Sequence, residues 1–395
     1  MTTSYDYDVI VAGAGPSGSS TALRLARAGR RVLLLDKQKF PRVKPCGGGV
    51  TARALAQAPV DLTPVIERRV SRVRFSFRLE DGFEYQFPET LVYMTQRQKL
   101  DAYLASQAAA AGANFDDDCA LVGVRQDADG VEIETESGAR FRAKVLVGAD
   151  GANGIVARSV NLDPVTNPPV ALEANFPYAG NASEEWDGTF ALELGSMPGG
   201  YGWSFPKEDH LNVGCGGWHS EGGRLRSHLA ALRSHYELDD WSMVNLRGHH
   251  LPTRTDGAPI VRDHVLLVGD AAGLVDPMSG EGIMAAFLSA RLAAESIERY
   301  LDGREPDLLR YEEEVEREIM ADIRAAGLLR DAFHSNPTLC FFMMKHNALF
   351  RRMLCEVMAG KRSYVEFVRW LGPAALGLRV WAAWGRKMRG NLATA

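Results

Sequence analysis

Residues 265–284 read VLLVGDAAGLVDPMSGEGIM, and this stretch decides the fold more than any other in the chain. Four apolar residues predict a buried strand that ends at Gly269 and Asp270. A carboxylate at that end of a strand can accept a hydrogen bond from a ribityl or ribose hydroxyl. A loop with Pro277, Gly280 and Gly282 follows, and then a helix of small residues from Ala285 to Ala294. The N-terminus of such a helix carries partial positive charge, which suits an electron-rich ring edge. An ordinary strand–turn–helix of an α/β domain is the alternative.

The N-terminal segment contains a second strand–turn–helix unit, with a glycine fingerprint in its turn. Residues 8–12 form a short apolar strand, a helix extends to Gly29, and a strand over residues 31–35 ends at Asp36. The turn reads Gly13-Ala14-Gly15-Pro16-Ser17-Gly18. Its first glycine permits the tight turn, the second lets a pyrophosphate approach, and the third lets helix and strand pack closely. Asp36 lies 18 residues beyond Gly18, where a carboxylate accepts ribose hydroxyls, so the unit predicts dinucleotide binding.

The number of such units indicates which dinucleotide is bound. Only one glycine fingerprint occurs in the 395 residues, and there is no second unit for a separate nicotinamide domain. We therefore expect a bound FAD that is reduced by an external donor, NAD(P)H or reduced ferredoxin.

Two further features agree with a flavin site. Residues 145–149 form an apolar strand that ends in the turn Asp150-Gly151. Arg97 opens an alanine-rich helix that stops at Gly112. An arginine at a helix start can simply be solvated, and it could equally reach a phosphate or the ring of the flavin.

Together these motifs resemble those of the FAD enzymes that include p-hydroxybenzoate hydroxylase. Within that group, PRVKPCGGG at residues 41–49 and YGWSFPK at residues 201–207 resemble the geranylgeranyl reductases, which saturate isolated double bonds of prenyl chains. The resemblance extends from about residue 5 to about residue 330. It implies an α/β fold, with a Rossmann-type FAD-binding domain, an inserted mainly antiparallel β-sheet domain for the substrate, and a C-terminal helical segment. We place the first at residues 1–70, 95–165 and 255–330, the second at 70–95 and 165–255, and the third at 331–395.

The resemblance also assigns cofactor contacts, position by position. It implies that FAD is bound by Asp36, Cys46, Gly47, Gly49, Arg97, Asp270, Gly282 and Ile283, with Leu121 near the adenine. The turns described above add Gly13, Ala14, Gly15, Ser17, Gly18, Lys37, Asp150, Gly269, Pro277 and Gly280 to the expected contacts. Asp36 stands where the family often has Glu, which changes the reach of the carboxylate but not its chemistry.

Alternating strands predict the second sheet. Residues 73–79, 83–87, 189–194 and 212–216 alternate or are rich in strand-forming residues, and Tyr201, Trp203 and Phe205 lie two apart, so they share one face of a strand. These aromatic side chains are either sheet core or the wall of a prenyl pocket, and the neighbouring flavin motifs favour the wall. Lys207 either closes a strand end at the surface or attracts a diphosphate or glycerol phosphate headgroup.

The chemistry of an isolated alkene narrows the catalytic candidates. An isolated alkene has no neighbouring group that could delocalise the charge of an added hydride. Its reduction therefore needs a proton donor as well as a hydride from the flavin. Positive charge develops on the more substituted carbon. Aromatic faces can stabilise that charge by about 0.5–2 kcal/mol each. Cys46 and Tyr201 are the two candidate acids, and a thiol that merely fits its loop is the alternative for Cys46.

The cysteine content and the first residues of the chain indicate which cellular compartment to expect. The five cysteines, Cys46, Cys119, Cys215, Cys340 and Cys355, are odd in number and have no CxxC spacing. Neither a disulfide framework nor a zinc or iron–sulfur site follows, and we expect a reducing cytoplasm. No basic region precedes the first strand, so a signal peptide is not expected.

The C-terminal segment is basic and aromatic. Residues 345–395 contain ten Lys/Arg and two Glu, net +8, which leaves −13 on residues 1–344 of a chain whose net charge is −5. Three charged residues interrupt the apolar stretch 365–384, so we expect an interfacial pair of amphipathic helices on the inner face of a membrane rather than a span. A helical cap on the FAD domain is the alternative. Nucleic-acid binding is not expected, because no reading module accompanies the charge.

Three functions remain to be compared. The first is reduction of a prenyl chain, carried by a glycerolipid, a chlorophyll, a menaquinone or a free diphosphate. The second is an oxygen-using monooxygenase or halogenase, which would share every flavin motif. The third is a non-catalytic prenyl carrier, against which the intact Asp36, Arg97 and Asp270 argue.

Overall fold

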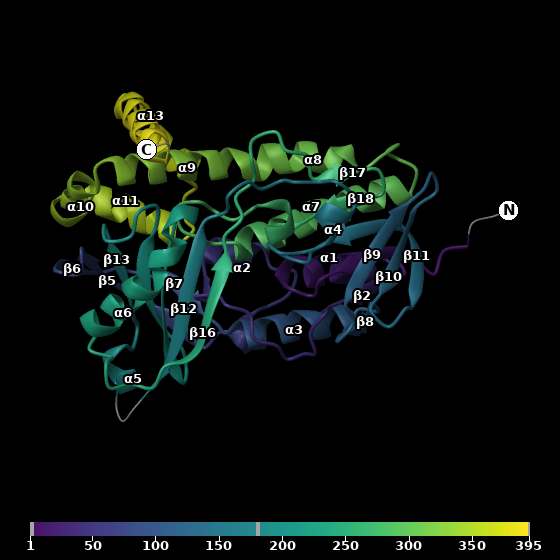
Figure 1. The fold of residues 1–395 in the computed structure, drawn as a ribbon, viewed down its shortest axis with the longest axis horizontal. Coiled ribbons are helices and arrows are strands. Elements are labelled where there is room, and N and C mark those ends of the chain that lie inside the picture. Colours follow the sequence, from purple (N-terminus) through teal and green to yellow (C-terminus); the bar gives the residue numbers. More distant parts are fainter. Residues whose placement is uncertain (1–3, 179–181, 394–395) are drawn as a thin grey trace.

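Two large β-sheets lie toward opposite ends of the long axis of the molecule, with α7 (Ile283–Leu301), α8 (Leu309–Val315) and α9 (Ala321–Ser335) along one side (Figure 1). The computed structural model describes residues 4–178 and 182–393. One sheet is mainly parallel and contains the dinucleotide turn, and the other is mainly antiparallel and contains the aromatic strand. The predicted α/β fold with an added antiparallel sheet and a C-terminal helical segment is confirmed.

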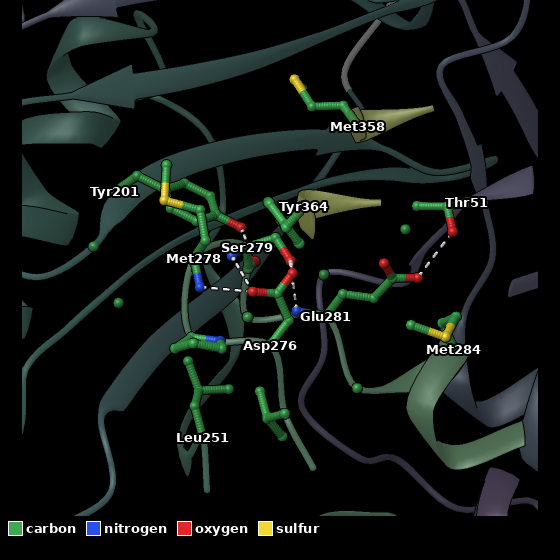
Figure 2. Close-up of a pocket in the computed structure, with 18 of the residues that line it drawn as sticks. Thr51, Tyr201, Leu251, Asp276, Met278, Ser279, Glu281, Met284, Met358 and Tyr364 are labelled. Carbon is green, nitrogen blue, oxygen red and sulfur yellow. Dashed lines mark hydrogen bonds between the residues drawn. The ribbon is translucent and has the colours of Figure 1, made fainter. Parts of the chain in front are cut away.

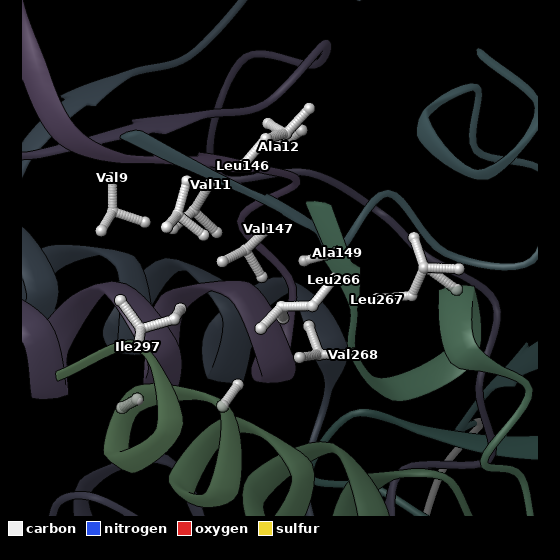
Figure 3. Close-up of a cluster of buried hydrophobic side chains, with 14 of the residues drawn as sticks. Val9, Val11, Ala12, Leu146, Val147, Ala149, Leu266, Leu267, Val268 and Ile297 are labelled. Atoms are coloured by element: carbon white, nitrogen blue, oxygen red, sulfur yellow. The ribbon is translucent and has the colours of Figure 1, made fainter. Parts of the chain in front are cut away.

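The mainly parallel sheet is built around β1 (Tyr7–Ala12), which pairs in parallel with β2 (Val32–Leu35) and β11 (Arg140–Gly148). These strands are apolar runs, typical of strands buried on both faces. Helix α1 (Pro16–Arg27) packs beside α7, and Figure 3 shows Ile297 of α7 in the same apolar cluster as the strand residues Val9 and Val147. The remaining strands of this sheet are β8 (Asn114–Asp116), β9 (Leu121–Gln126), β10 (Val131–Thr135), β17 (Val261–Arg262) and β18 (Val265–Leu267).

Strand direction in this sheet positions the site. Strands β1, β2, β11 and β18 run parallel to one another, so their carboxyl ends meet at one edge. The residues that follow these strands, Gly13, Asp36, Ala149 and Asp270, are thereby gathered at that edge, which is where open α/β sheets bind ligands.

The second sheet has the order β16-β12-β15-β14-β13-β5-β6. All neighbours are antiparallel except β13 and β5, which are parallel. Helix α6 (Leu225–His235) packs its apolar face, with Leu225, Leu229 and Leu232, against one side of the sheet. The strands are β5 (Arg72–Phe77), β6 (Asp81–Gln86), β12 (Val170–Pro177), β13 (Thr189–Leu194), β14 (Tyr201–Pro206), β15 (His210–Gly217) and β16 (Val244–His250).

Short elements connect the two sheets. A three-stranded sheet consists of β3 (Gly49–Val50), β7 (Val92–Met94) and β4 (Arg68–Val70). The helices of this region and of the connections are α2 (Ala52–Gln57), α3 (Arg97–Ala110), α4 (Val156–Ser159) and α5 (Ala182–Glu185), with short 3-10 turns at Thr63–Val65, His219–Arg224 and Gly269–Ala272.

The C-terminal segment forms a helical cap. After α9 come α10 (Pro337–His346), α11 (Ala348–Met358), α12 (Tyr364–Trp370) and α13 (Ala374–Ala393), with a π-helical turn at Glu316–Met320 before α9. Phe341 of α10 stacks on Phe77 of β5, with ring centroids 4.8 Å apart, so the cap shares a core with the second sheet. Among the described residues, none of the helices has the length and apolar character needed to cross a membrane.

Candidate functional site

The turn between β1 and α1 is shaped by glycines. Gly13 has φ +106°, and a Cβ there would lie 2.3 Å from the Ala149 carbonyl oxygen. A Cβ on Gly18 would lie 1.8 Å from the carbonyl oxygen of Gly13. Both positions therefore require glycine for helix and strands to approach this closely. Gly15, the N-cap of α1, provides no side chain to its free N–H groups, and Pro16 begins the helix, so this N-terminus can receive an anion.

Two arginines lie beside this helix start. Arg97 Nη2 is 3.6 Å from the position of a Cβ on Gly15, and the Arg97 side chain is only 7 % exposed, so it is not simply solvated. Asp101 holds it with two hydrogen bonds of 2.7 and 2.8 Å. Burial alone would lower the pKa of Arg97, but the Asp101 carboxylate raises it above its ordinary value. Arg42 reaches both Asp101 (2.9 Å) and Asp36 (3.2 Å).

Asp36 is positioned as the fingerprint predicts. Its carboxylate follows β2 and accepts the backbone N–H of Ala14 (2.9 Å) and of Gln38 (3.0 Å). The neighbouring Lys37 is exposed. Leu121 begins β9 rather than the strand directly after α3, which is β8, although a 2.8 Å bond from the Cys119 N–H to the Asp36 carbonyl ties its segment to this corner.

The Asp150 carboxylate forms hydrogen bonds within its own loop. Its carboxylate accepts the N–H groups of Ile155 (2.6 Å) and Val156 (2.9 Å), where α4 begins, so it turns back into its own loop. Burial raises the pKa of Asp150. Its chain neighbours Ala149 and Gly151 line the cavity instead. Both of these bonds use Oδ2, and the contact between Asp150 and the cofactor stays a prediction.

Asp270 faces two basic groups from distant segments. Its carboxylate lies 3.2 Å from Lys44 Nζ and 3.7 Å from His249 Nε2. Burial would raise the pKa of Asp270, but Lys44 and His249 together hold it far below its ordinary value, so the group is ionised. A Cβ on Gly282 would lie 3.0 Å from Asp270 Oδ1, which shows how closely the start of α7 approaches this carboxylate.

The other residues predicted to bind FAD in the segment 269–283 lie close to Asp270 or line the cavity. A Cβ on Gly269 would be 2.7 Å from Ser17 Oγ, so this glycine allows α1 and the β18 turn to touch. Pro277, Gly280, Gly282 and Ile283 line the cavity, as do Gly15 and Ser17.

Buried polar groups of the second sheet hold the glycine-rich loop at residues 46–49. Glu173 accepts the Cys46 N–H (2.8 Å), and Lys207 Nζ donates to the Gly47 carbonyl. The Cys46 thiol accepts the N–H of Gly48 at 3.3 Å. Burial raises the pKa of Glu173 to about 7 and lowers that of Lys207 to about 8. Lys207 is only 2 % exposed, so the expectation of a strand end at the surface is wrong, whereas binding of a headgroup by Lys207 stays a prediction.

The three aromatic residues of β14 form one continuous row. The ring centroids of Tyr201 and Trp203 are 6.0 Å apart, and those of Trp203 and Phe205 are 6.3 Å apart. Trp203 Nε1 donates to Asn212 Oδ1 (2.8 Å), and Phe205 packs on Gly47. The Tyr201 hydroxyl donates to the Ser279 carbonyl. Burial and the nearby Asp276 and Glu281 raise the pKa of Tyr201.

A single cavity of about 800 Å³ connects these groups with the helical cap. It begins at the dinucleotide turn and the loop at 46–49, passes the aromatic row, and continues under α10–α13. Figure 2 shows the part near Tyr201, Met284 and Met358. Apolar side chains of the cap that line it are Met343, Leu354, Met358, Phe367, Leu371 and Leu378.

The residues present fit an FAD. The uncapped start of α1 with Arg97 and Arg42 suits the pyrophosphate, and the Asp36 carboxylate suits the ribose. The glycines at 13 and 18 leave a cradle that side chains would fill. Asp270 with Lys44, beside the start of α7, suits the ribityl chain and the electron-rich edge of the flavin. Lys44 belongs to the motif at residues 41–49, whereas no local sequence motif marks His249 or Glu173 as site residues.

Comparison with known proteins agrees with this geometry. Residues 6–176 match the family model described as FAD binding domain. The chain is 32 % identical to digeranylgeranylglycerophospholipid reductase 1 of Methanopyrus kandleri, over 73 % of this chain and 80 % of that protein. It is also 32 % identical to menaquinone reductase of Mycolicibacterium smegmatis, over 73 % and 75 % of the two chains. The crystal structure of a geranylgeranyl bacteriochlorophyll reductase-like protein of Thermoplasma acidophilum superimposes with a TM-score of 0.78 at 25 % identity, covering 92 % of this chain and 98 % of that chain.

Proposed function

Since this chain belongs to the geranylgeranyl reductase family of FAD-dependent oxidoreductases, we propose that it reduces isolated carbon–carbon double bonds of a geranylgeranyl or polyprenyl chain. The observation that carries the proposal is the cavity, which joins the FAD residues to a long apolar space under the helical cap. The two curated relatives are named for a digeranylgeranyl lipid and for menaquinone. Both names fit a substrate with a polar head and a prenyl tail.

The chain's own residues have three tasks in this reaction. Bound FAD, once reduced by NAD(P)H or reduced ferredoxin from outside, supplies hydride. Arg97, Arg42 and Asp36 would hold the adenine and pyrophosphate end of the FAD, and Asp270 with Lys44 would hold its flavin end. The aromatic row of β14 places the alkene and excludes water from it, and its ring faces stabilise developing positive charge by about 0.5–2 kcal/mol each.

The two candidate acids differ in their surroundings. Cys46 lines the cavity, and its thiol can still donate because it accepts the bond from Gly48. Tyr201 already donates to the Ser279 carbonyl, and its pKa is raised. We therefore assign Tyr201 to the pocket wall and keep Cys46 as a polar group beside the reacting bond.

We also propose that the outer face of the cap rests on a membrane leaflet. Exposed apolar side chains gather on α10–α13, over the far end of the cavity: Leu339, Phe342, Leu349, Trp370, Leu376, Val380 and Trp381. Exposed Arg369 and Arg379 lie among them, and neither makes an ion pair with any described residue. A prenyl chain in the leaflet would enter the cavity from this side.

Anaerobic single turnover tests the proposed reaction. Dithionite-reduced protein, mixed under nitrogen with a geranylgeranyl lipid, is expected to be reoxidised, with two hydrogens added per saturated bond by mass spectrometry. Trp203→Ala should slow reoxidation while FAD stays bound, because Trp203 belongs to the sheet rather than to the FAD cradle. The alternative, a monooxygenase or halogenase, requires oxygen. Product that gains oxygen only in air, with no alkene reduction under nitrogen, would overturn the proposal.

A further inference from the structure

A pair of carboxyl groups lies in the cavity wall and has no task in the function proposed above. Asp276 and Glu281 both belong to the loop before α7 (Figure 2). Tyr364 of α12 and Thr51, the N-cap of α2, enclose them from the cap and from the FAD side.

The two carboxyl groups differ in their hydrogen bonds. Asp276 accepts the N–H groups of Met278 (2.7 Å) and Ser279 (3.3 Å), the Ser279 hydroxyl (2.6 Å) and the Tyr364 hydroxyl. Burial raises the pKa of Asp276 above its ordinary value, and these donors oppose that shift and favour its ionised form more than the fewer donors at Glu281 favour that of Glu281. Among the described residues, Glu281 accepts from Thr51 alone, through the hydroxyl at 3.2 Å and the backbone N–H.

Few charges oppose this pair. Arg53 of α2 is the cation that acts on Glu281, and it is already bound to Asp322 of α9 at 2.7 Å. The other titratable groups that face the pair, Tyr201 of β14 and Tyr364 of α12, are neutral phenols whose pKa values are raised. Two carboxyl groups in one apolar site cannot both ionise easily, so the proton remains on the one with fewer donors. Burial and the charge of Asp276 accordingly raise the pKa of Glu281 to about 7.

The position of Glu281 is suited to the reacting centre. It directly precedes Gly282 and Ile283, where α7 begins next to Asp270, and it lines the same cavity as Cys46 and Trp203. Glu281 is therefore next in the chain to the flavin end of the FAD cradle and lines the cavity that the substrate would occupy.

We propose that Glu281 is the proton donor of the alkene reduction. Its carboxyl proton forms a C–H bond with the less substituted carbon, using the electron pair of the C=C π bond. The more substituted carbon takes the hydride of the reduced flavin, so the alkene gains two electrons and two hydrogens. Glu281 is left as a carboxylate and regains a proton from solvent. This inference rests on the proposed function.

Anaerobic reoxidation of the reduced holoenzyme separates Glu281 from the other acids. Glu281→Gln keeps the shape but cannot donate an acidic proton, and the rate should fall by about 10²–10⁴. Glu281→Asp should recover part of the rate. Cys46→Ser and Tyr201→Phe should each cost less than tenfold. Glu295→Gln, on the exposed side of the same helix, is the matched control and should behave as wild type.

A second readout needs no turnover. Infrared titration of the oxidised holoenzyme should show a protonated carboxyl band that ionises near pH 7 and is absent from Glu281→Gln. The difference between the two proteins isolates Glu281 from Glu173 and Glu193, whose pKa values are also raised to about 7. This titration can be run on wild type and Glu281→Asp if Glu281→Gln does not retain FAD.

The outcomes separate the two proposals. Wild type that fails to reduce prenyl chains under nitrogen sinks the proposed function itself. Wild type that reduces them, while Glu281→Gln does so within about twofold of its rate, sinks only the role of Glu281. Ionisation of the Glu281 band below about pH 5 would do the same.

Discussion

At the scale of single residues, Asp270 is a half-buried carboxylate in the wall of the cavity. It is ionised, and Lys44 and His249 point at it from the loop before β3 and from β16. Burying a charged group in a cavity wall costs free energy unless the group is paired and hydrogen-bonded. Lys44 and His249 provide this pairing, and the three polar groups together suit the hydroxyl groups and the ring edge of a flavin.

Asp270→Ala should purify largely without FAD. Loss of the carboxylate removes a charged hydrogen-bond partner, worth about 1.5–3 kcal/mol, and leaves Lys44 without its counter-charge. We expect the Kd for FAD to rise by roughly 10- to 100-fold. Asp36→Ala should weaken binding at the adenine end by about tenfold.

Absorbance of the flavin after gel filtration, and titration of the apoprotein, measure both effects. Asp302→Asn, at the surface, is the control. Full flavin occupancy and unchanged affinity in both cavity variants would show that these carboxylates do not hold FAD.

Turn chemistry explains which site residues could be predicted from the sequence. Gly13, Gly18 and Asp36 belong to a local motif whose geometry follows from its spacing. His249 and Glu173 have no such motif. Asp270 and Lys44 are separated by 226 positions, and Glu173 and Cys46 by 127, so their contacts depend on how the two sheets meet.

At the scale of elements, the β5–β6 hairpin depends on a buried carboxyl from a neighbouring strand. Glu193 of β13 is fully buried. It accepts the N–H of Leu79 at 3.2 Å and a bond from Ser196. Arg78 and Leu79 have φ +55° and +63°, so the hairpin turn places ordinary side chains in the left-handed region, which is unfavourable without support.

Glu193 predicts a pH dependence of stability. Burial raises its folded pKa to about 7 from 4.5. The folded state therefore binds more protons than the unfolded state between these values. The stability contribution of the neutral form is complete below about pH 4.5 and is lost as the pH rises to about 7.

Urea unfolding of Glu193→Gln against wild type measures this contribution. The glutamine carries no proton to lose, so its stability should fall less over that range, by about 1–3 kcal/mol. Glu84→Gln on the exposed strand β6 is the control. Parallel pH profiles for wild type and Glu193→Gln would contradict the prediction.

The strands themselves were predictable only where their patterns were regular. The predicted strands at 73–79, 83–87, 189–194, 201–205 and 212–216 correspond to β5, β6, β13, β14 and β15. The first of them was predicted two residues too long, because β5 ends at Phe77 and the turn follows. Strand β12 was missed because Glu173 and Asn175 interrupt its apolar run with polar groups that serve the site. Strand β16 is polar and mostly exposed, so only its pairing with β12 defines it.

At the scale of the whole molecule, the charge of the C-terminal cap is smaller than its composition suggests. Five of its basic residues are paired within the protein: Lys345 with Asp81, Arg352 and Arg362 with Glu356, Lys361 with Glu89, and Arg386 with Asp331. Two of these partners, Asp81 and Glu89, belong to the second sheet region. Ion pairs between residues far apart in the sequence cannot be predicted from the charge of one segment. These pairs show that part of the basic segment attaches the cap to the rest of the protein.

The membrane prediction rests on exposed apolar side chains of the cap and on basic residues that form no ion pair with a described residue. Leu376 and Val380 are 72 % and 65 % exposed, and Arg369 and Arg379 lie beside them in the sequence of α12 and α13. Each Lys or Arg near an anionic leaflet contributes about 1 kcal/mol. Arg369→Gln with Arg379→Gln should therefore weaken binding to anionic vesicles by roughly 10- to 30-fold.

Cosedimentation with phosphatidylglycerol vesicles measures this binding. Leu376→Gln with Val380→Gln should also weaken it, and in neutral vesicles only this pair should matter. Added salt should reduce binding of the wild type, because charges separated by more than about 8 Å are screened at physiological ionic strength.

Val122→Gln, on the exposed face of β9 at the other end of the molecule, is the control. A short water-soluble prenyl substrate should still be reduced by both double variants, because neither pair belongs to the FAD cradle or to the aromatic row. Vesicle binding equal to that of wild type in both double variants would show that this face of the cap does not meet the membrane.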